Sequence, residues 1–223
     1  FTSKVEYQLK LHEAERNLEL AYALGAPHED YPLQIHISDK DREFSRDFIS
    51  KNGVLPCDLL IGINPCSVWP TKRWIPERFA QVGDALSNEF KARIILAGGQ
   101  EDGWLVEKIA LFMKTRPILA AGRLSLKHLA GVMERCRLFI TNDSGPLHIA
   151  MAMKTPTVAI FGPTTTNLGF GPYGESFRVV EKVGLSCRPC GKHGGHRCPL
   201  KNFACMKEIT VDDVVLAARE LIR

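Results

Sequence analysis

The 223-residue sequence lacks several features that would by themselves assign it to a class. No uninterrupted apolar run approaches the ~18 residues that a membrane-spanning helix needs. There is no internal repeat and no low-complexity tract, which excludes a repeat architecture. No Gly-x-Gly-x-x-Gly fingerprint directly follows a predicted strand, so a nicotinamide dehydrogenase is disfavoured. The net charge is only +4, and a solvated surface of mixed sign explains it better than an anionic partner does.

Alternation of strands and helices is the main positive feature of the sequence. Between residues 58 and 161, short apolar runs that suit buried strands alternate with amphipathic stretches that suit helices. This pattern is typical of an α/β fold with a parallel sheet flanked by helices. We expect strands at 33–37, 59–63, 93–97, 118–120, 137–141, 157–161 and 177–180, and helices at 4–24, 41–51, 76–90, 101–113, 125–136, 148–153 and 211–222.

The stretch from Arg137 to Thr164, RLFITNDSGPLHIAMAMKTPTVAIFGPT, predicts a strand, a tight turn, a helix and a second strand. Asp143 and Ser144 are helix-capping residue types, and Gly145 lets a ligand approach the backbone. Open α/β sheets bind ligands outside the carboxyl ends of their strands, and a helix N-terminus attracts phosphate. The stretch therefore indicates an anion site, although an ordinary strand-to-helix turn is equally consistent with it. The Asp143 carboxylate either caps the helix or accepts a hydrogen bond from a ligand hydroxyl.

A loop rich in cations follows the predicted strand at 59–63. It combines the hydroxyl of Ser67 with the adjacent Lys72 and Arg73, the supply of donors that a pyrophosphate site uses. Taken alone, the segment is better explained as a surface loop with Trp74 packed on the edge of the sheet.

A second loop, after the predicted strand at 93–97, begins with two glycines that permit close approach of the backbone to a ligand. The carboxylates of Glu101 and Asp102 come directly after them. Carboxylates at this place either bind the hydroxyls of a ribose or cap the next helix.

TNDSGPLHIA followed by TPTVAIFGPT resembles the signature of glycosyltransferase family 9, the ADP-heptose:lipopolysaccharide heptosyltransferases. KRWIP is similar to the Lys-x-Trp-Pro segment of that family, with Ile75 inserted before Pro76. The resemblance covers roughly residues 55 to 222. It implies the C-terminal half of a GT-B glycosyltransferase, in which a Rossmann-like parallel sheet flanked by helices binds the nucleotide sugar.

The resemblance also implies roles for individual residues. Ser67 and Lys72 would contact the donor phosphates, and Glu101, with Asp102 in reserve, would bind the ribose. Leu124 would line the adenine pocket, unless its segment is only a capped helix start. The residues assigned to the diphosphate and the donor sugar are Asp143, Ser144, Gly145 and His148. His148 is also consistent with a buried histidine whose hydrogen bonds are satisfied.

For the domains, the resemblance implies an inter-domain helix and acceptor-domain boundary at residues 1–54 and a donor domain at residues 55–223. The predicted helix at 4–24 is similar to the helix that leads out of the acceptor domain in that family, so we expect the sequence, which begins with Phe1 rather than Met, to start after most of that domain. We expect inverting transfer of heptose from ADP-heptose to the lipopolysaccharide inner core, with no metal or cofactor required. The family's base is an Asp of the acceptor domain with no match here, so we expect donor binding without turnover. The resemblance implies a cytoplasmic protein, peripheral at the inner membrane, without a nucleic-acid partner.

Cysteines near the C-terminal end form the remaining motif, Cys187-x2-Cys190-x7-Cys198-x6-Cys205. Structural zinc, free thiols and disulfides are all consistent with it, and a cytosolic location disfavours disulfides. A zinc-stabilised interaction module is therefore one alternative function. A different GT-B nucleotide-sugar enzyme, either a UDP-sugar transferase or an epimerase, is the other, and it would prefer UDP.

Overall fold

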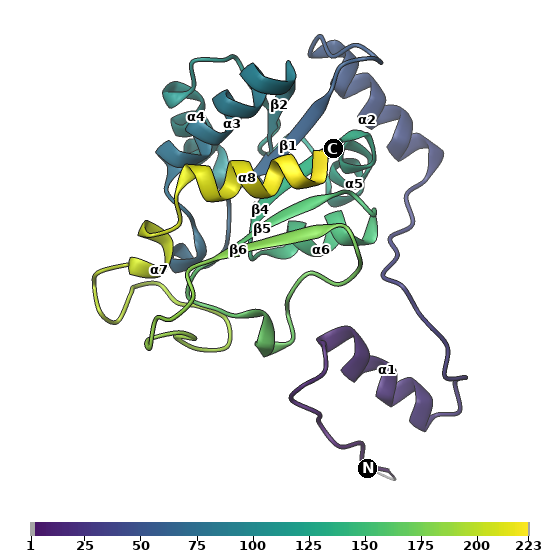
Figure 1. Cartoon of the computed structure of the whole chain (residues 1–223). Helices are drawn as coiled ribbons and strands as arrows, with labels where there is room; N and C mark the ends of the chain where they lie inside the picture. The colour runs from purple at the N-terminus through teal and green to yellow at the C-terminus, as the bar shows by residue number, and fades with distance from the viewer. Residues whose placement is uncertain (1–2, 223) are drawn as a thin grey trace.

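The computed structural model describes residues 3–222 and shows a parallel six-stranded sheet with helices on both faces (Figure 1). The strand order is β3-β2-β1-β4-β5-β6, and all neighbouring strands are parallel. The strands are β1 (Leu60–Asn64), β2 (Arg93–Leu96), β3 (Ile118–Leu119), β4 (Leu138–Asn142), β5 (Thr157–Phe161) and β6 (Phe177–Glu181). The α/β fold expected from the alternating pattern is confirmed.

Two layers of helices cover the sheet because its strands are apolar on both faces. Neighbouring strand residues point to opposite sides, so Ile94 and Leu96 join the core cluster under α3, α4 and α8, whereas Ile95 joins the cluster under α2 and α5. The helices are α1 (Glu13–Ala23), α2 (Asp39–Lys51), α3 (Pro76–Phe90), α4 (Gly103–Phe112), α5 (Leu126–Arg135), α6 (Gly145–Ala152), α7 (Ala204–Lys207) and α8 (Val211–Ile222).

The N-terminal segment forms a shorter helix than the predicted one at 4–24. The ring of His12 accepts a hydrogen bond from the backbone N–H of Ala14 at 3.1 Å, and the Glu15 carboxylate accepts one from the backbone N–H of His12 at 2.8 Å. This capping box starts α1 at Glu13, so the residues before it are not helical. The strand predicted at 33–37 is also wrong, because that segment pairs with no edge of the sheet.

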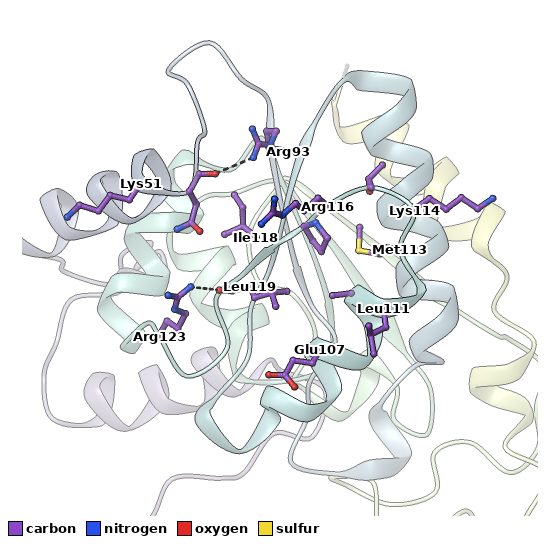
Figure 2. Close-up of a pocket in the computed structure, with 14 residues that line it drawn as sticks. Lys51, Arg93, Glu107, Leu111, Met113, Lys114, Arg116, Ile118, Leu119 and Arg123 are labelled. Carbon is purple, nitrogen blue, oxygen red and sulfur yellow. Dashed lines mark hydrogen bonds between the residues drawn. The ribbon is translucent and has the colours of Figure 1, made fainter.

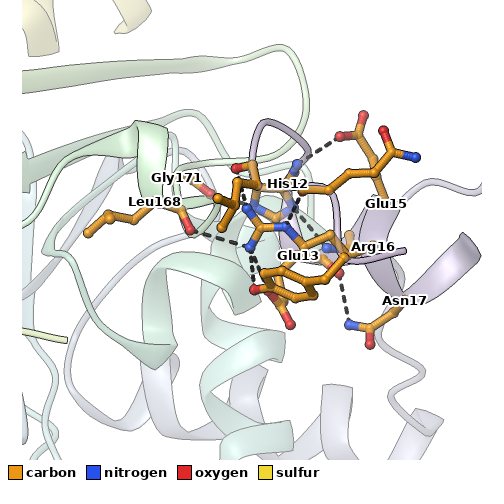
Figure 3. A network of polar contacts seen from close by, with 11 residues as sticks. His12, Glu13, Glu15, Arg16, Asn17, Leu168 and Gly171 are labelled. Atoms are coloured by element: carbon orange, nitrogen blue, oxygen red, sulfur yellow. Dashed lines mark hydrogen bonds and ion pairs between the residues drawn. The ribbon is translucent and has the colours of Figure 1, made fainter. Parts of the chain in front are cut away.

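A buried arginine fastens α1 to the loop that follows β5 (Figure 3). The guanidinium of Arg16 donates to the backbone carbonyl groups of Gln8, Leu9 and Leu168 at 2.9, 2.6 and 3.4 Å. It also forms an ion pair with the carboxylate of Glu13 at 2.9 Å. The backbone of α1 is therefore held beside a loop that borders the carboxyl end of the sheet.

α2 packs against α5, and its N-cap is Ser38. The Ser45 hydroxyl in the middle of α2 donates to the backbone carbonyl of His128 at 2.8 Å. Ile49 of α2 is buried in the same cluster as Leu60 of β1. Residues on both sides of residue 54 thus share one core, and the division into domains at that residue stays a prediction.

Candidate functional site

The strand order reverses between β1 and β4, which places the loops after these two strands side by side. The side chain of Asn142, at the end of β4, joins the two loops. Its amide donates to the backbone carbonyl of Pro65 at 2.7 Å and accepts a hydrogen bond from the backbone N–H of Trp74 at 3.1 Å. A crevice at such a reversal is where open α/β sheets bind their ligands.

Trp74 anchors the loop after β1. Its side chain is buried, its indole N–H donates to the backbone carbonyl of Ile209 at 3.3 Å, and its ring meets the ring of Phe79 edge-on at 5.1 Å between centroids. The anchor fixes the short 3₁₀ turn Pro70–Lys72 that directly precedes it. Lys72 is thereby presented to the end of β4.

Lys72 and Asp143 form a buried ion pair at the centre of this crevice. The Nζ atom of Lys72 lies 2.6 Å from Oδ2 of Asp143, and only 9% and 4% of the two residues are exposed. The hydroxyl of Thr164, from the loop after β5, donates to the same oxygen at 2.6 Å. Asp143 therefore orients the ammonium group of Lys72. This pairing explains how a carboxylate can stand next to an anion site.

The N-terminus of α6 opens beside this ion pair. Ser144, not Asp143, is the N-cap residue, and it makes no side-chain capping bond. The expectation that Asp143 caps the helix is thus wrong. Because no side chain caps it, the positive end of α6 is left open to an anion. A methyl group added at Gly145 would meet no atom within 4 Å, so the space in front of the helix is open.

His148 lies one turn into α6 and faces the same space. Burial lowers the pKa of His148, and the nearby Asp143 carboxylate opposes this effect only in part. The imidazole is therefore mainly neutral at pH 7 and can act as a hydrogen-bond donor or acceptor.

Most of the residues that the sequence singled out for donor binding line one cavity of about 230 Å³. They are Ser67, Lys72, Asp143, Ser144, Gly145 and His148. The remainder of its lining consists of Val68, Trp69, Phe170, Lys192 and His193. The cavity thus combines two lysines, one carboxylate, hydroxyl groups and a helix N-terminus, a set of groups that suits a phosphorylated ligand.

Known proteins with the same sequence pattern and fold identify the family. The sequence model of glycosyltransferase family 9 (heptosyltransferase) matches residues 2–201. The chain belongs to glycosyltransferase family 9. Lipooligosaccharide heptosyltransferase 2 of Campylobacter jejuni is 32% identical over 185 residues, which make up 81% of this chain and 55% of that protein. The chain therefore spans little more than half the length of this relative.

Solved structures of family 9 proteins share the fold. The glycosyl transferase family 9 protein from Veillonella parvula superposes with a TM-score of 0.84 at 32% identity, over 98% of this chain and 62% of that one. Escherichia coli heptosyltransferase WaaC with ADP superposes with a TM-score of 0.68 at 19% identity, over 99% of this chain and 60% of that one. At that identity the second likeness shows the fold alone.

Within this family 9 chain, Glu101 and Leu124 lie outside the cavity, after β2 and β3. Their two loops adjoin, since the backbone N–H of Gly122 donates to the carbonyl of Gly98 at 3.1 Å. The side chain of Asp102 is already engaged, because it accepts a hydrogen bond from the Gly99 backbone at 3.1 Å. Glu101 is exposed and is the freer of the two acids. The ribose role of Glu101 and the adenine role of Leu124 stay predictions.

Six residues at the cavity were not assigned from the sequence. Thr164 holds Asp143, and the other five line the cavity: Val68, Trp69, Phe170, Lys192 and His193. Thr164 and Phe170 belong to the Gly/Thr loop at residues 164–171, whose composition suits a loop that closes over a ligand but does not indicate which of its residues make contacts. Lys192 and His193 lie inside the cysteine motif, and nothing in their local sequence places them near β4.

All seven cysteines of the chain are free thiols. Among residues 3–222, no group of three His, Cys, Asp or Glu side chains is arranged to hold a metal ion. The disulfide alternative for Cys187, Cys190, Cys198 and Cys205 is therefore not realised in this structure. Structural zinc at these four residues stays a prediction.

Proposed function

We propose that this chain forms the donor-binding half of an inverting heptosyltransferase that transfers heptose from ADP-heptose to the lipopolysaccharide inner core. The observation that carries the proposal is the cavity in which Lys72, Asp143 and His148 surround the N-terminus of α6. Membership of family 9 supports it, as do relatives named lipooligosaccharide and lipopolysaccharide heptosyltransferases.

In the proposed reaction, an acceptor hydroxyl attacks the anomeric carbon of the heptose. The bond from that carbon to the diphosphate oxygen breaks, and ADP leaves with the bonding electrons. A general base takes the proton of the acceptor hydroxyl, and we propose that this base belongs to the acceptor half of the enzyme. Negative charge grows on the departing diphosphate, toward which Lys72 and the start of α6 are oriented. Donors that are fixed before the reaction stabilise such developing charge most effectively, because they need not reorganise.

Calorimetric titration with ADP and with UDP, without added metal, tests the proposal. We expect saturable ADP binding, weaker UDP binding and a loss of ADP affinity in Lys72→Ala. UDP binding as tight as that of ADP would favour the UDP-sugar transferase or epimerase. The absence of binding for both nucleotides would contradict the donor site.

The acceptor in the proposed reaction is a lipid-linked saccharide, so we further propose that the enzyme works at the anionic face of the inner membrane. A cleft of about 980 Å³ supports this placement (Figure 2). It runs along the edge strand β3, shares no lining residue with the donor cavity, and contains one acid, Glu107, among its basic residues. These are Lys51, Arg93, Lys114, Arg116 and Arg123. The α4 residue Leu111 lines the cleft and is 86% exposed, which suits contact with lipid.

Within residues 3–222 no helix is both long enough and apolar enough to cross a bilayer. The association proposed for the basic cleft is electrostatic and reversible, with each cation near the surface contributing about 1 kcal/mol.

A further inference from the structure

The cysteine-rich segment is attached to both loops that border the donor cavity. Near its start, the guanidinium of Arg188 donates to the carbonyl of Thr164 at 2.7 Å. The backbone N–H of Cys190 donates to the carbonyl of Pro163, in the loop after β5, at 2.8 Å. The hydroxyl of Thr71, in the loop after β1, donates to the carbonyl of Gly195 at 2.7 Å and accepts from its N–H at 2.8 Å. Residues 191–194 thereby form a bridge between the two loops that border the cavity.

This bridge lies directly against Lys72. Gly194 has a φ of +83°, and a methyl group added there would come within 3.2 Å of the Cγ atom of Lys72. Only glycine is free of strain in this backbone conformation and also leaves room for the lysine stem. The bridge therefore helps to hold Lys72 in place as well as covering it.

The charges in the cavity leave one cation unmatched. Lys72 is paired with Asp143, and burial keeps His148 mainly neutral at pH 7. Lys192, on the bridge, lines the same cavity, and its ammonium group lies 5.5 Å from the centre of the Phe170 ring. Among the described residues, Lys192 forms no ion pair within 4.0 Å. The hydrogen bond from Arg16 and, to a smaller extent, the charge of Lys192 lower the pKa of Glu13, but that carboxylate lies outside the cavity lining and is paired with Arg16 at 2.9 Å. Within the cavity, an anionic ligand would thus find the unpaired positive charge on Lys192.

We propose that Lys192 binds the diphosphate of the donor and that residues 187–198 form a cap over the donor site. This inference rests on the proposed function and extends it to a segment outside the motifs that define the site. A nucleoside diphosphate carries several negative charges, and ammonium-to-phosphate hydrogen bonds are among the stronger contacts in proteins. In this proposal the adenosine part of the nucleotide, by contrast, does not contact Lys192.

Titration with ADP and with adenosine separates these contributions. Lys192→Ala should weaken ADP binding by about 10-fold or more, leave adenosine binding unchanged and reduce the dependence of ADP affinity on salt. Lys192→Arg should keep most of the affinity. Lys201→Ala removes an exposed lysine just beyond the cap. It should leave the affinities for ADP and adenosine unchanged and serves as the control.

The outcomes distinguish the cap from the donor site itself. If the wild-type chain binds ADP and Lys192→Ala binds it equally well, the cap is rejected and the donor site remains. If the wild-type chain binds no ADP, both are rejected.

A pair of glycine variants examines the cap without changing a charge. Gly194→Ala should weaken ADP binding because the added methyl displaces Lys72. Gly191→Ala also has a positive φ but meets no atom within 4 Å, so ADP affinity should be kept. Equal affinity in both variants would overturn the contact between the bridge and the site.

Discussion

The Nζ atom of Lys72 lies 2.6 Å from the Oδ2 atom of Asp143, so the lysine proposed to bind phosphate is already paired before any ligand arrives. The pair contributes little net charge to the cavity but fixes the direction in which the ammonium group points. Because both side chains are buried, neither can be removed without leaving the other unmatched.

Stability should reveal this dependence. Lys72→Met leaves the Asp143 carboxylate buried without a cation, and we expect a loss of about 3 kcal/mol in the free energy of unfolding. The double variant Lys72→Met/Asp143→Asn should recover part of the loss. Urea unfolding measures both. Lys108→Met removes the exposed pair with Glu77 at 3.8 Å and should cost less than about 1 kcal/mol. Equal losses in the buried and exposed pairs would contradict the argument.

Ribose binding should depend on Glu101. Glu101→Gln removes the charge that strengthens hydrogen bonds to the ribose hydroxyls, so we expect ADP affinity to fall about 10-fold. Asp102 accepts a hydrogen bond from the Gly99 backbone and forms an ion pair with Arg73 at 3.7 Å, so Asp102→Asn should mainly loosen the contact between these two loops. Titration with ADP and with 2′-deoxy-ADP distinguishes the two: the 2′-hydroxyl should matter less in Glu101→Gln. A larger effect at Asp102 would transfer the role to that residue.

His148 should make the folded state sensitive to mild acid. Its pKa in the folded chain lies below the ordinary value of 6.5, chiefly because of burial. The unfolded chain therefore binds the proton more readily. The stabilising contribution of the neutral ring is fully present above pH 6.5 and declines as the pH falls from there toward the lowered pKa. Unfolding free energy, measured from pH 7.5 down to 5, should fall more steeply for the wild-type chain than for His148→Gln. Parallel curves would show that the ring does not titrate this way.

The thiols should differ in reactivity. Backbone N–H groups of residues 200–203 lower the pKa of Cys198, although burial acts against them. Burial raises the pKa of Cys136 to about 12 and is the main cause that raises the pKa of Cys205 to about 11. Alkylation at pH 7.5, followed by mass spectrometry, should therefore label Cys198 early and Cys136 only after unfolding. Protection of Cys198 that disappears with a chelator would instead indicate the metal site that the sequence leaves open.

The basic cleft should govern adsorption to lipid. Lys114→Glu/Arg116→Glu places two acids among its cations, and we expect binding to phosphatidylglycerol vesicles to fall more than about 10-fold. Both positions are exposed, so folding should be unaffected. Lys40→Glu/Lys201→Glu makes the same charge change at exposed positions outside the cleft. Equal losses for the two double variants would point to net charge alone, and binding to neutral phosphatidylcholine serves as the background.

Local sequence was sufficient for most of the regular elements. α3, β5 and α8 begin and end where the spacing of apolar residues predicted them. It failed at α1, where the amphipathic pattern continues toward residue 4 but the capping box at His12 starts the helix later. It failed again at 33–37, because alternation of apolar and polar residues cannot show whether a neighbouring strand is available.

The sequence by itself determined the family and the parallel α/β fold, and it singled out the motifs after β1 and β4 whose residues line the cavity, because each motif depends on residues close together in the chain. Only the tertiary structure decided what those residues do to one another. It paired Asp143 with Lys72, although 71 positions separate them, and it brought Lys192 to the same cavity. Strand order and long-range hydrogen bonds made these contacts, and no local pattern of residue types encodes them.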